Sequence, residues 1–195
     1  HVQERADLNI PPLPLDADQT SQLVELLKSE HDESDFLLNL FKERVPAGVD
    51  QAAYVKAAFL ADISEGNASS PYIDNIEAVK ILGTMLGGYN IQPLIKCLKN
   101  DELAATAVDT LSKTLLIFDA FNEIFELSKT NKYAEQVIKN WADATWFTDK
   151  QDLPKKIKLT VYKVSGEINT DDLSPAPDAW SRPDIPLHAL AMFKM

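Results

Sequence analysis

YNIQPLIKCLKNDELAATAVDTLSKTLL, residues 89–116, is the stretch that decides the fold class. Its apolar side chains recur three and four residues apart, which is the spacing of one face of a helix. They are Ile91, Leu94, Ile95 and Leu98, followed by Leu103, Ala104, Ala107, Val108 and Leu111. The pair Asn100-Asp101 separates the two groups and is typical of a helix break. The stretch therefore predicts two short amphipathic helices that pack against each other.

The same pattern extends in both directions, over residues 16–152. Helix starts are expected where a capping side chain precedes an apolar run, at Thr20 or Ser21, at Ser34 and at Asp50. The spacing Pro-Leu-Ile-x-x-Leu and then x-x-Leu-x-x-x-Ala within residues 89–116 is typical of a helix pair in a HEAT-like repeat. Stacked helix pairs bury a continuous core and leave broad surfaces for docking. We predict a mainly α protein whose residues 16–152 form a HEAT-like α-helical domain.

Residues 1–15 lack this pattern. Pro11, Pro12 and Pro14 fall within five residues, and a proline and the residue before it avoid helical torsions. We expect an extended N-terminal segment. It has no apolar run like that of a secretion signal. Because the chain begins with His1 rather than Met, we also expect that a few residues precede it.

The pattern changes again at residue 153. Ile157, Leu159 and Val161 alternate with polar residues, which is typical of a half-buried strand. A polar loop stiffened by prolines follows over residues 169–183. Because a single strand does not fold alone, residues 153–195 are predicted to be the incomplete start of a second, α/β domain.

Polar side chains are concentrated in this loop. Asp171, Asp172, Ser174, Asp178 and Arg182 lie within twelve residues. Arginine presents a planar fork of donors that holds a carboxylate or a phosphate by two hydrogen bonds, and a nearby aspartate can orient that fork. The alternative is a surface turn with local hydrogen bonds between aspartate side chains and the backbone. The pattern of residues leaves both interpretations open.

Composition narrows the class of protein. The net charge is −11, and the acidic excess lies wholly in residues 1–150. Nucleic-acid affinity comes mostly from Lys and Arg that neutralise phosphates, so DNA binding is not expected. No apolar run is long enough to cross a bilayer. The one cysteine, Cys97, sits on a predicted apolar helix face, so we expect a buried thiol, no disulfide and no cysteine-held metal. We expect a cytoplasmic protein.

The loop also carries a family resemblance. Residues 169–176, NTDDLSPA, resemble the entry to the swivel domain of the aconitase superfamily. The run at 178–191, DAWSRPDIPLHALA, is similar to the bacterial aconitase B family in particular. Shorter matches in the helical part, among them RVP at 44–46, AYVKA at 53–57 and GGYNI at 87–91, resemble the HEAT-like domain of the same family.

The resemblance implies a chemistry. Aconitase B interconverts citrate and isocitrate through cis-aconitate, and often hydrates 2-methyl-cis-aconitate. A [4Fe-4S] cluster held by three cysteines binds the substrate at its open iron, where it acts as a Lewis acid. The residue matching Arg182 binds a substrate carboxylate. Asp171 is implied as an orienting residue and Ser174 as active-site support.

The resemblance also implies binding partners, and it predicts what this chain can do by itself. It implies a homodimer formed through the helical domain, a contribution of that domain to the channel leading to the active site, and messenger RNA binding by the cluster-free form. No cluster cysteine is present, because Cys97 matches none of them. We therefore expect the chain by itself to hold no cluster and to be inactive. The alternative is a stand-alone helical-repeat adaptor that binds protein or RNA, which would have no need of residues 157–195.

Overall fold

The computed structural model describes residues 1–86, 88–114, 120–149, 152–161, 163–178 and 188–194. These residues contain helices and no strand. The helices are α1 (Val2–Asp7), α2 (Ala17–Leu27), α3 (Ser34–Glu43), α4 (Gln51–Glu65), α5 (Asn75–Leu82), α6 (Ile91–Cys97), α7 (Ala104–Lys113), α8 (Phe121–Ser128), α9 (Lys132–Ala142), α10 (Thr145–Thr148) and α11 (Thr170–Leu173). Among the described residues, no helix has the length and apolar character needed to span a membrane.

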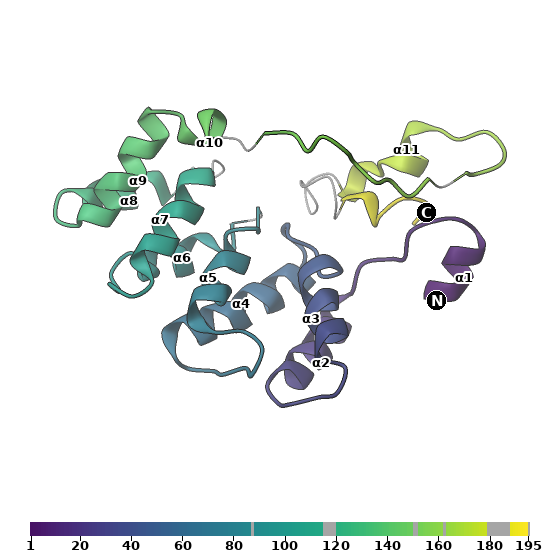
Figure 1. Ribbon diagram of the computed structural model, residues 1–195, viewed down its shortest axis with the longest axis horizontal. Helices are drawn as coiled ribbons and strands as arrows, with labels where there is room; N and C mark the ends of the chain where they lie inside the picture. Colours follow the sequence, from purple (N-terminus) through teal and green to yellow (C-terminus); the bar gives the residue numbers. More distant parts are fainter. Residues whose placement is uncertain (87, 115–119, 150–151, 162, 179–187, 195) are drawn as a thin grey trace.

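Helices α2 to α9 form one curved row (Figure 1). Helix α4 packs against α2 and α5, α7 packs against α5, α6 and α9, and α8 packs against α9. The apolar faces of these helices meet in a shared core. Its largest fully buried apolar side chains are Phe41, Leu27, Leu60, Ile63, Ile73, Leu82, Met85, Leu94, Ile95, Leu98 and Leu111. The predicted mainly helical character is confirmed, and residues 89–116 contribute the packed pair α6 and α7.

The ends of α4 follow from the sequence. The Asp50 side chain accepts a hydrogen bond from the Ala53 amide at 3.0 Å, which satisfies one of the free amides of the first turn. Gly66 ends the helix with a φ of +77°, a torsion that L residues with a Cβ rarely adopt. The expected cap at Ser34 is not formed, because Ser34 is already the first helical residue and Glu33 precedes it without a side-chain cap.

The start of α2 differs from the prediction. The cap is Asp16 rather than Thr20 or Ser21. The Asp16 carboxylate accepts from the Gln19 amide at 2.8 Å, and the Gln19 side chain accepts from the Asp16 amide at 3.1 Å. This reciprocal capping box satisfies both amides. Thr20 and Ser21 instead donate to backbone carbonyls one turn earlier, so the helix gains a turn relative to the prediction.

The junction of α5, α6 and α7 is held by two residues. The Asn90 amide group donates to the Leu82 and Met85 carbonyls at 2.9 and 2.8 Å, and it is fully buried. These bonds tie the start of α6 to the last residue of α5 and to the turn that follows it. Gly83 follows α5, and a Cβ built there would lie 2.7 Å from Thr110 Cβ. Glycine at this position therefore lets α7 approach closely.

The expected extended N-terminal segment is helical in its first half. Residues 2–7 form α1, because the prolines restrict the backbone only from residue 10 onward. The later part, residues 10–15, has no regular secondary structure and runs toward α2.

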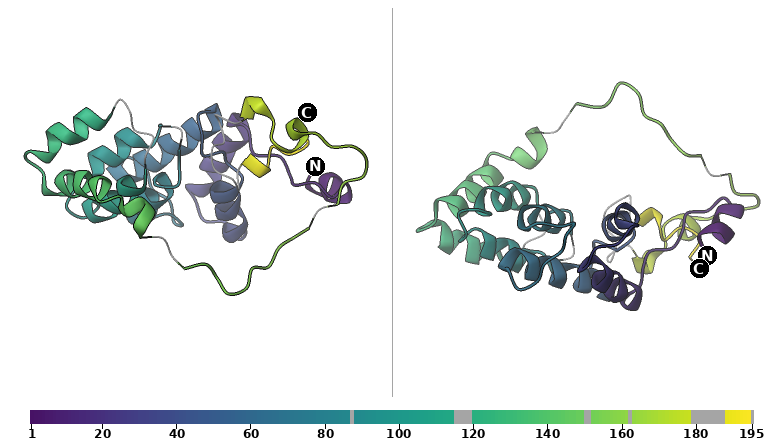
Figure 2. Two further views of the ribbon diagram at one scale, coloured as in Figure 1. Left: turned by 90° about the horizontal axis from the view of Figure 1, so that it is seen from above. Right: turned by 60° about the horizontal axis from the view of Figure 1, so that its bottom comes forward.

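The predicted strand is also not formed. Ile157, Leu159 and Val161 are 65%, 76% and 86% exposed. A strand requires a neighbouring strand to pair its backbone groups, and the described residues provide none. Residues 152–161 instead arch away from the helical row before the chain returns toward its N-terminus (Figure 2). The alternation of apolar and polar residues is therefore not enough to form a strand without a neighbouring strand to pair with.

Candidate functional site

The candidate site begins at α11, inside the loop that was expected to have no regular structure. Asn169 caps this short helix by accepting from the Asp172 amide at 3.0 Å, and the Asp172 carboxylate accepts from the Asn169 amide at 2.9 Å. The cap therefore uses Asp172 and leaves Asp171 exposed. Of the two adjacent carboxylates, Asp171 is the one available to a ligand or to a guanidinium group.

Ser174 contacts a histidine from the far end of the loop. Its Oγ lies 2.8 Å from His188 Nε2. Nearby, the Phe193 amide donates to the Asp172 carbonyl at 2.8 Å. These two contacts hold residues 188–194 beside α11, so the chain on either side of 179–187 is brought together.

A buried carboxylate is bonded to the same segment, residues 188–194. Asp178 ends a 3₁₀ turn, Ala176–Asp178, and is only 5% exposed. Lys194 Nζ lies 3.2 Å from Asp178 Oδ1. A buried charge needs such a partner to offset the loss of hydration. Arg182, the predicted carboxylate-binding residue, lies outside the described residues.

The N-terminal segment, residues 1–15, packs against the same region (Figure 1). Arg5 Nη2 donates to the Met192 carbonyl at 2.9 Å, and Arg5 Nε donates to the Pro11 carbonyl at 2.5 Å. Burial lowers the pKa of Arg5 from its ordinary value. One guanidinium group therefore joins two parts of the chain that are 187 residues apart in sequence.

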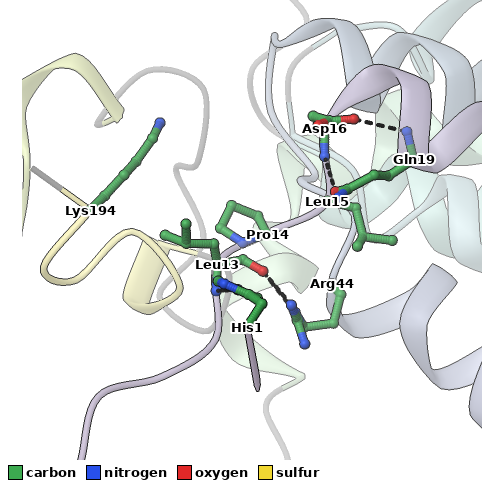
Figure 3. Close-up of a pocket in the computed structure, with 8 residues that line it drawn as sticks. All are labelled: His1, Leu13, Pro14, Leu15, Asp16, Gln19, Arg44 and Lys194. Atoms are coloured by element: carbon green, nitrogen blue, oxygen red, sulfur yellow. Dashed lines mark hydrogen bonds between the residues drawn. The ribbon is translucent and has the colours of Figure 1, made fainter. Parts of the chain in front are cut away.

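A cavity of about 350 Å³ lies between this region and the helical row (Figure 3). Arg44 lines it and donates through Nε and Nη2 to the Leu13 carbonyl, with Nε at 3.1 Å. Lys194 lines the cavity from the other side. The pKa of Arg44 is lowered, first by burial and then by the positive charge of Arg5. The guanidinium still remains charged at neutral pH.

The residues of the chain do not fit an iron–sulfur cluster. A cluster of the kind implied by the resemblance needs three cysteine ligands, and the chain has one. Cys97 is 3% exposed, and burial raises the pKa of its thiol, which disfavours the thiolate that binds metal. Among the described residues, no group of three His, Cys, Asp or Glu side chains is arranged to hold a metal ion.

Sequence reasoning missed Arg5 and His188 as contributors to this region. The partners that bring Arg5 and His188 into this region, Met192 and Ser174, are not their neighbours in sequence, so no local pattern marks the two residues. Their contacts span 187 and 14 residues respectively.

Comparisons with known proteins cover both parts of the chain. Residues 1–147 match a family model described as the aconitate B N-terminal domain, and residues 159–195 match one described as the aconitate hydratase 2 N-terminus. The chain is 58% identical to aconitate hydratase B of Pseudomonas aeruginosa, 58% identical to that of Escherichia coli K12 and 56% identical to that of a Synechocystis species. Each comparison covers 100% of this chain and 23% of the relative.

Proposed function

The chain belongs to the aconitase B N-terminal domain family, and we propose that it forms part of an aconitate hydratase. Such an enzyme interconverts citrate and isocitrate through cis-aconitate, and we extend the proposal to hydration of 2-methyl-cis-aconitate. The observation that carries the proposal is the identity of 56–58% across the whole chain with proteins of that name. Since the chain spans 23% of their length, the activity is assigned to a longer polypeptide.

Within that enzyme, residues 169–183 bind the substrate. Arg182 holds a carboxylate of citrate through its planar fork, because two parallel hydrogen bonds fix both position and orientation. Asp171 orients the guanidinium or the substrate. The exposure of the Asp171 carboxylate, which the α11 cap does not use, supports this role.

Ser174 supports the site indirectly. Its contact with His188 at 2.8 Å favours a role in holding the loop ends together. The [4Fe-4S] cluster, which supplies Lewis-acid chemistry when it is bound, is held by residues that this chain does not contain. The chain alone is therefore proposed to be inactive.

The helical domain is proposed to form a homodimer and to contribute to the channel that leads to the active site. Two exposed, stacked rings on α8, Phe121 and Phe125, support a docking role. Messenger RNA binding by the cluster-free form ranks below dimerisation, because the net charge of −11 opposes a phosphate backbone. A stand-alone adaptor is the second candidate, and the family match over residues 159–195 speaks against it. We place the enzyme in the cytoplasm.

The substitution Arg182→Lys in the complete enzyme tests the substrate role. A lysine is a point charge and cannot replace the two-pronged fork. We expect the KM for citrate to rise by about tenfold or more, since a hydrogen bond to a charged group is worth roughly 1.5–3 kcal/mol. Steady-state kinetics with citrate and with isocitrate measure this change.

A matched control is Lys158→Arg, which makes the reverse exchange at an exposed linker position. It should leave the kinetics unchanged. The chain of 195 residues, assayed alone, is a second control and is expected to show no hydratase activity. Wild-type kinetics for Arg182→Lys would remove this residue from the substrate site.

A further inference from the structure

The exposed residues 152–161 do not fix α11 and residues 188–194 against the helical row. Residues 152–161 are exposed throughout, and none of them makes a hydrogen bond or an ion pair within the described chain. They arch away from the rest of the molecule (Figure 2). An exposed extended stretch of this kind leaves its two ends free to move relative to each other. Another contact must therefore hold the segment in place.

The N-terminal segment provides that contact. The side chain of Arg5 donates to the Met192 carbonyl at 2.9 Å and to the Pro11 carbonyl at 2.5 Å. Met192 immediately precedes Phe193, whose amide donates to the Asp172 carbonyl in α11. Arg5 therefore holds Met192, and the next residue in the chain, Phe193, is bonded to α11, the helix that carries Asp171.

The N-terminal segment is in turn fixed to the helical row. The Arg44 guanidinium, just after α3, donates to the Leu13 carbonyl. The Leu15 amide donates to the Arg44 carbonyl at 2.7 Å. Arg44 therefore binds the segment through both its side chain and its backbone. The hydrogen bonds of Arg44, Arg5 and Phe193, joined by short stretches of backbone, connect the end of α3 to α11.

We propose that Arg5 is a positioning residue for substrate binding, which fixes residues 188–194 and α11 against the N-terminal segment. This role rests on the proposed carboxylate-binding function of residues 169–183. The planar guanidinium group of Arg5 suits this role, because it donates to two carbonyls at once. One is that of Pro11 in the N-terminal segment, and the other is that of Met192 near the other end of the chain. A charged donor to a carbonyl is also stronger than a neutral one.

Hydrogen exchange on this chain tests the contact itself. In Arg5→Ala, exchange of the Phe193 amide should become about tenfold faster, since loss of a charged hydrogen bond is worth about one factor of ten or more. Arg5→Lys should give an intermediate rate, because an ammonium group keeps the charge and can donate to a carbonyl but lacks the planar fork that reaches two carbonyls at once. Amides in α7 should be unaffected. The matched control is Gln3→Ala, which removes a bond to Asp7 within α1. Gln3 makes no hydrogen bond to the described residues 169–178 or 188–194.

Kinetics of the complete enzyme test the consequence. Arg5→Ala should raise the KM for citrate by about tenfold and change kcat much less, because Arg5 positions the segment without touching the reacting atoms. Arg5→Lys should restore part of the loss. Unchanged exchange at Phe193 would overturn the contact. Faster exchange with an unchanged KM would overturn the link to substrate. Arg182→Lys, measured in parallel, reports on the proposed function separately, since the exchange result does not depend on substrate.

Discussion

Gly83 shows how one residue without a side chain sets the distance between two helices. Its backbone is in the right-handed helical region, with a φ of −65°, so alanine would suit the torsions. By propensity alone, alanine would stabilise the position by roughly 0.5–1 kcal/mol. A Cβ would, however, lie 2.7 Å from Thr110 Cβ and closer still to its Cγ2. The contact with α7 therefore decides the sign of the effect.

We expect Gly83→Ala to lower the free energy of unfolding by about 1–3 kcal/mol, the usual cost of overpacking a core. Urea denaturation followed by circular dichroism measures it. Adding Thr110→Ser removes the clashing methyl group and should restore part of the stability. A stabilised single variant would show that α5 and α7 are not packed this closely.

At the scale of one element, the N-terminal cap of α2 differs between the sequence-based prediction and the structure. The prediction placed the cap at Thr20 or Ser21, both of which are good capping residues. The structure uses Asp16 with Gln19 in a reciprocal pair. A proline precedes Asp16 by two residues, and the chain reaches the helix from the N-terminal segment that Arg44 holds. The reciprocal Asp16–Gln19 pair therefore begins the helix one turn earlier than predicted.

Asp16→Ala should lower the free energy of unfolding by about 1 kcal/mol, because the Gln19 amide in the first turn loses the carboxylate that accepts its hydrogen bond. Ser21→Ala is the matched control. Ser21 is exposed and donates to the Ala17 carbonyl within the helix, so its loss should change stability by less than roughly 0.5 kcal/mol. Chemical denaturation of both variants decides between the two positions. A larger loss for Ser21→Ala would restore the predicted cap.

At the scale of the whole molecule, the exposed rings on α8 bear on assembly. Phe121 and Phe125 are each 45% exposed and stack with centroids 6.2 Å apart. Phe121 also stacks on Trp141 of α9 at 6.1 Å. Aromatic residues that are exposed together on one face are enriched in protein interfaces. This face fits the proposed homodimer.

Sedimentation velocity across a range of concentrations tests that assembly. Phe125→Ser should weaken self-association by about tenfold or more, since a central aromatic contact is worth roughly 2 kcal/mol. Phe36→Ser is the control, because Phe36 is 58% exposed on α3, a different element of the row. It should leave association unchanged. A chain that stays monomeric at every concentration would exclude a dimer formed by this domain alone.

Much of the fold could be predicted because helices are set by neighbours in sequence. Apolar residues three and four positions apart fix which face is buried, and Asp50 and Gly66 fix where α4 begins and ends. The HEAT-like repeat, the domain boundary at 152/153 and the role of Arg182 stay predictions. The strand at 157–161 was wrong for the described chain, because alternation specifies a strand only when a partner is available.

The sequence by itself determined the helical class, the family and the position of the polar loop that carries Asp171 and Arg182. Only the tertiary structure decided which distant residues hold that loop, with Ser174 meeting His188 and Arg5 reaching Met192. The physical reason is range. Apolar periodicity and helix caps depend on residues about one helical turn apart. The contacts of Ser174 and Arg5 depend instead on how the fold brings distant parts of the chain together, which no local sequence pattern indicates.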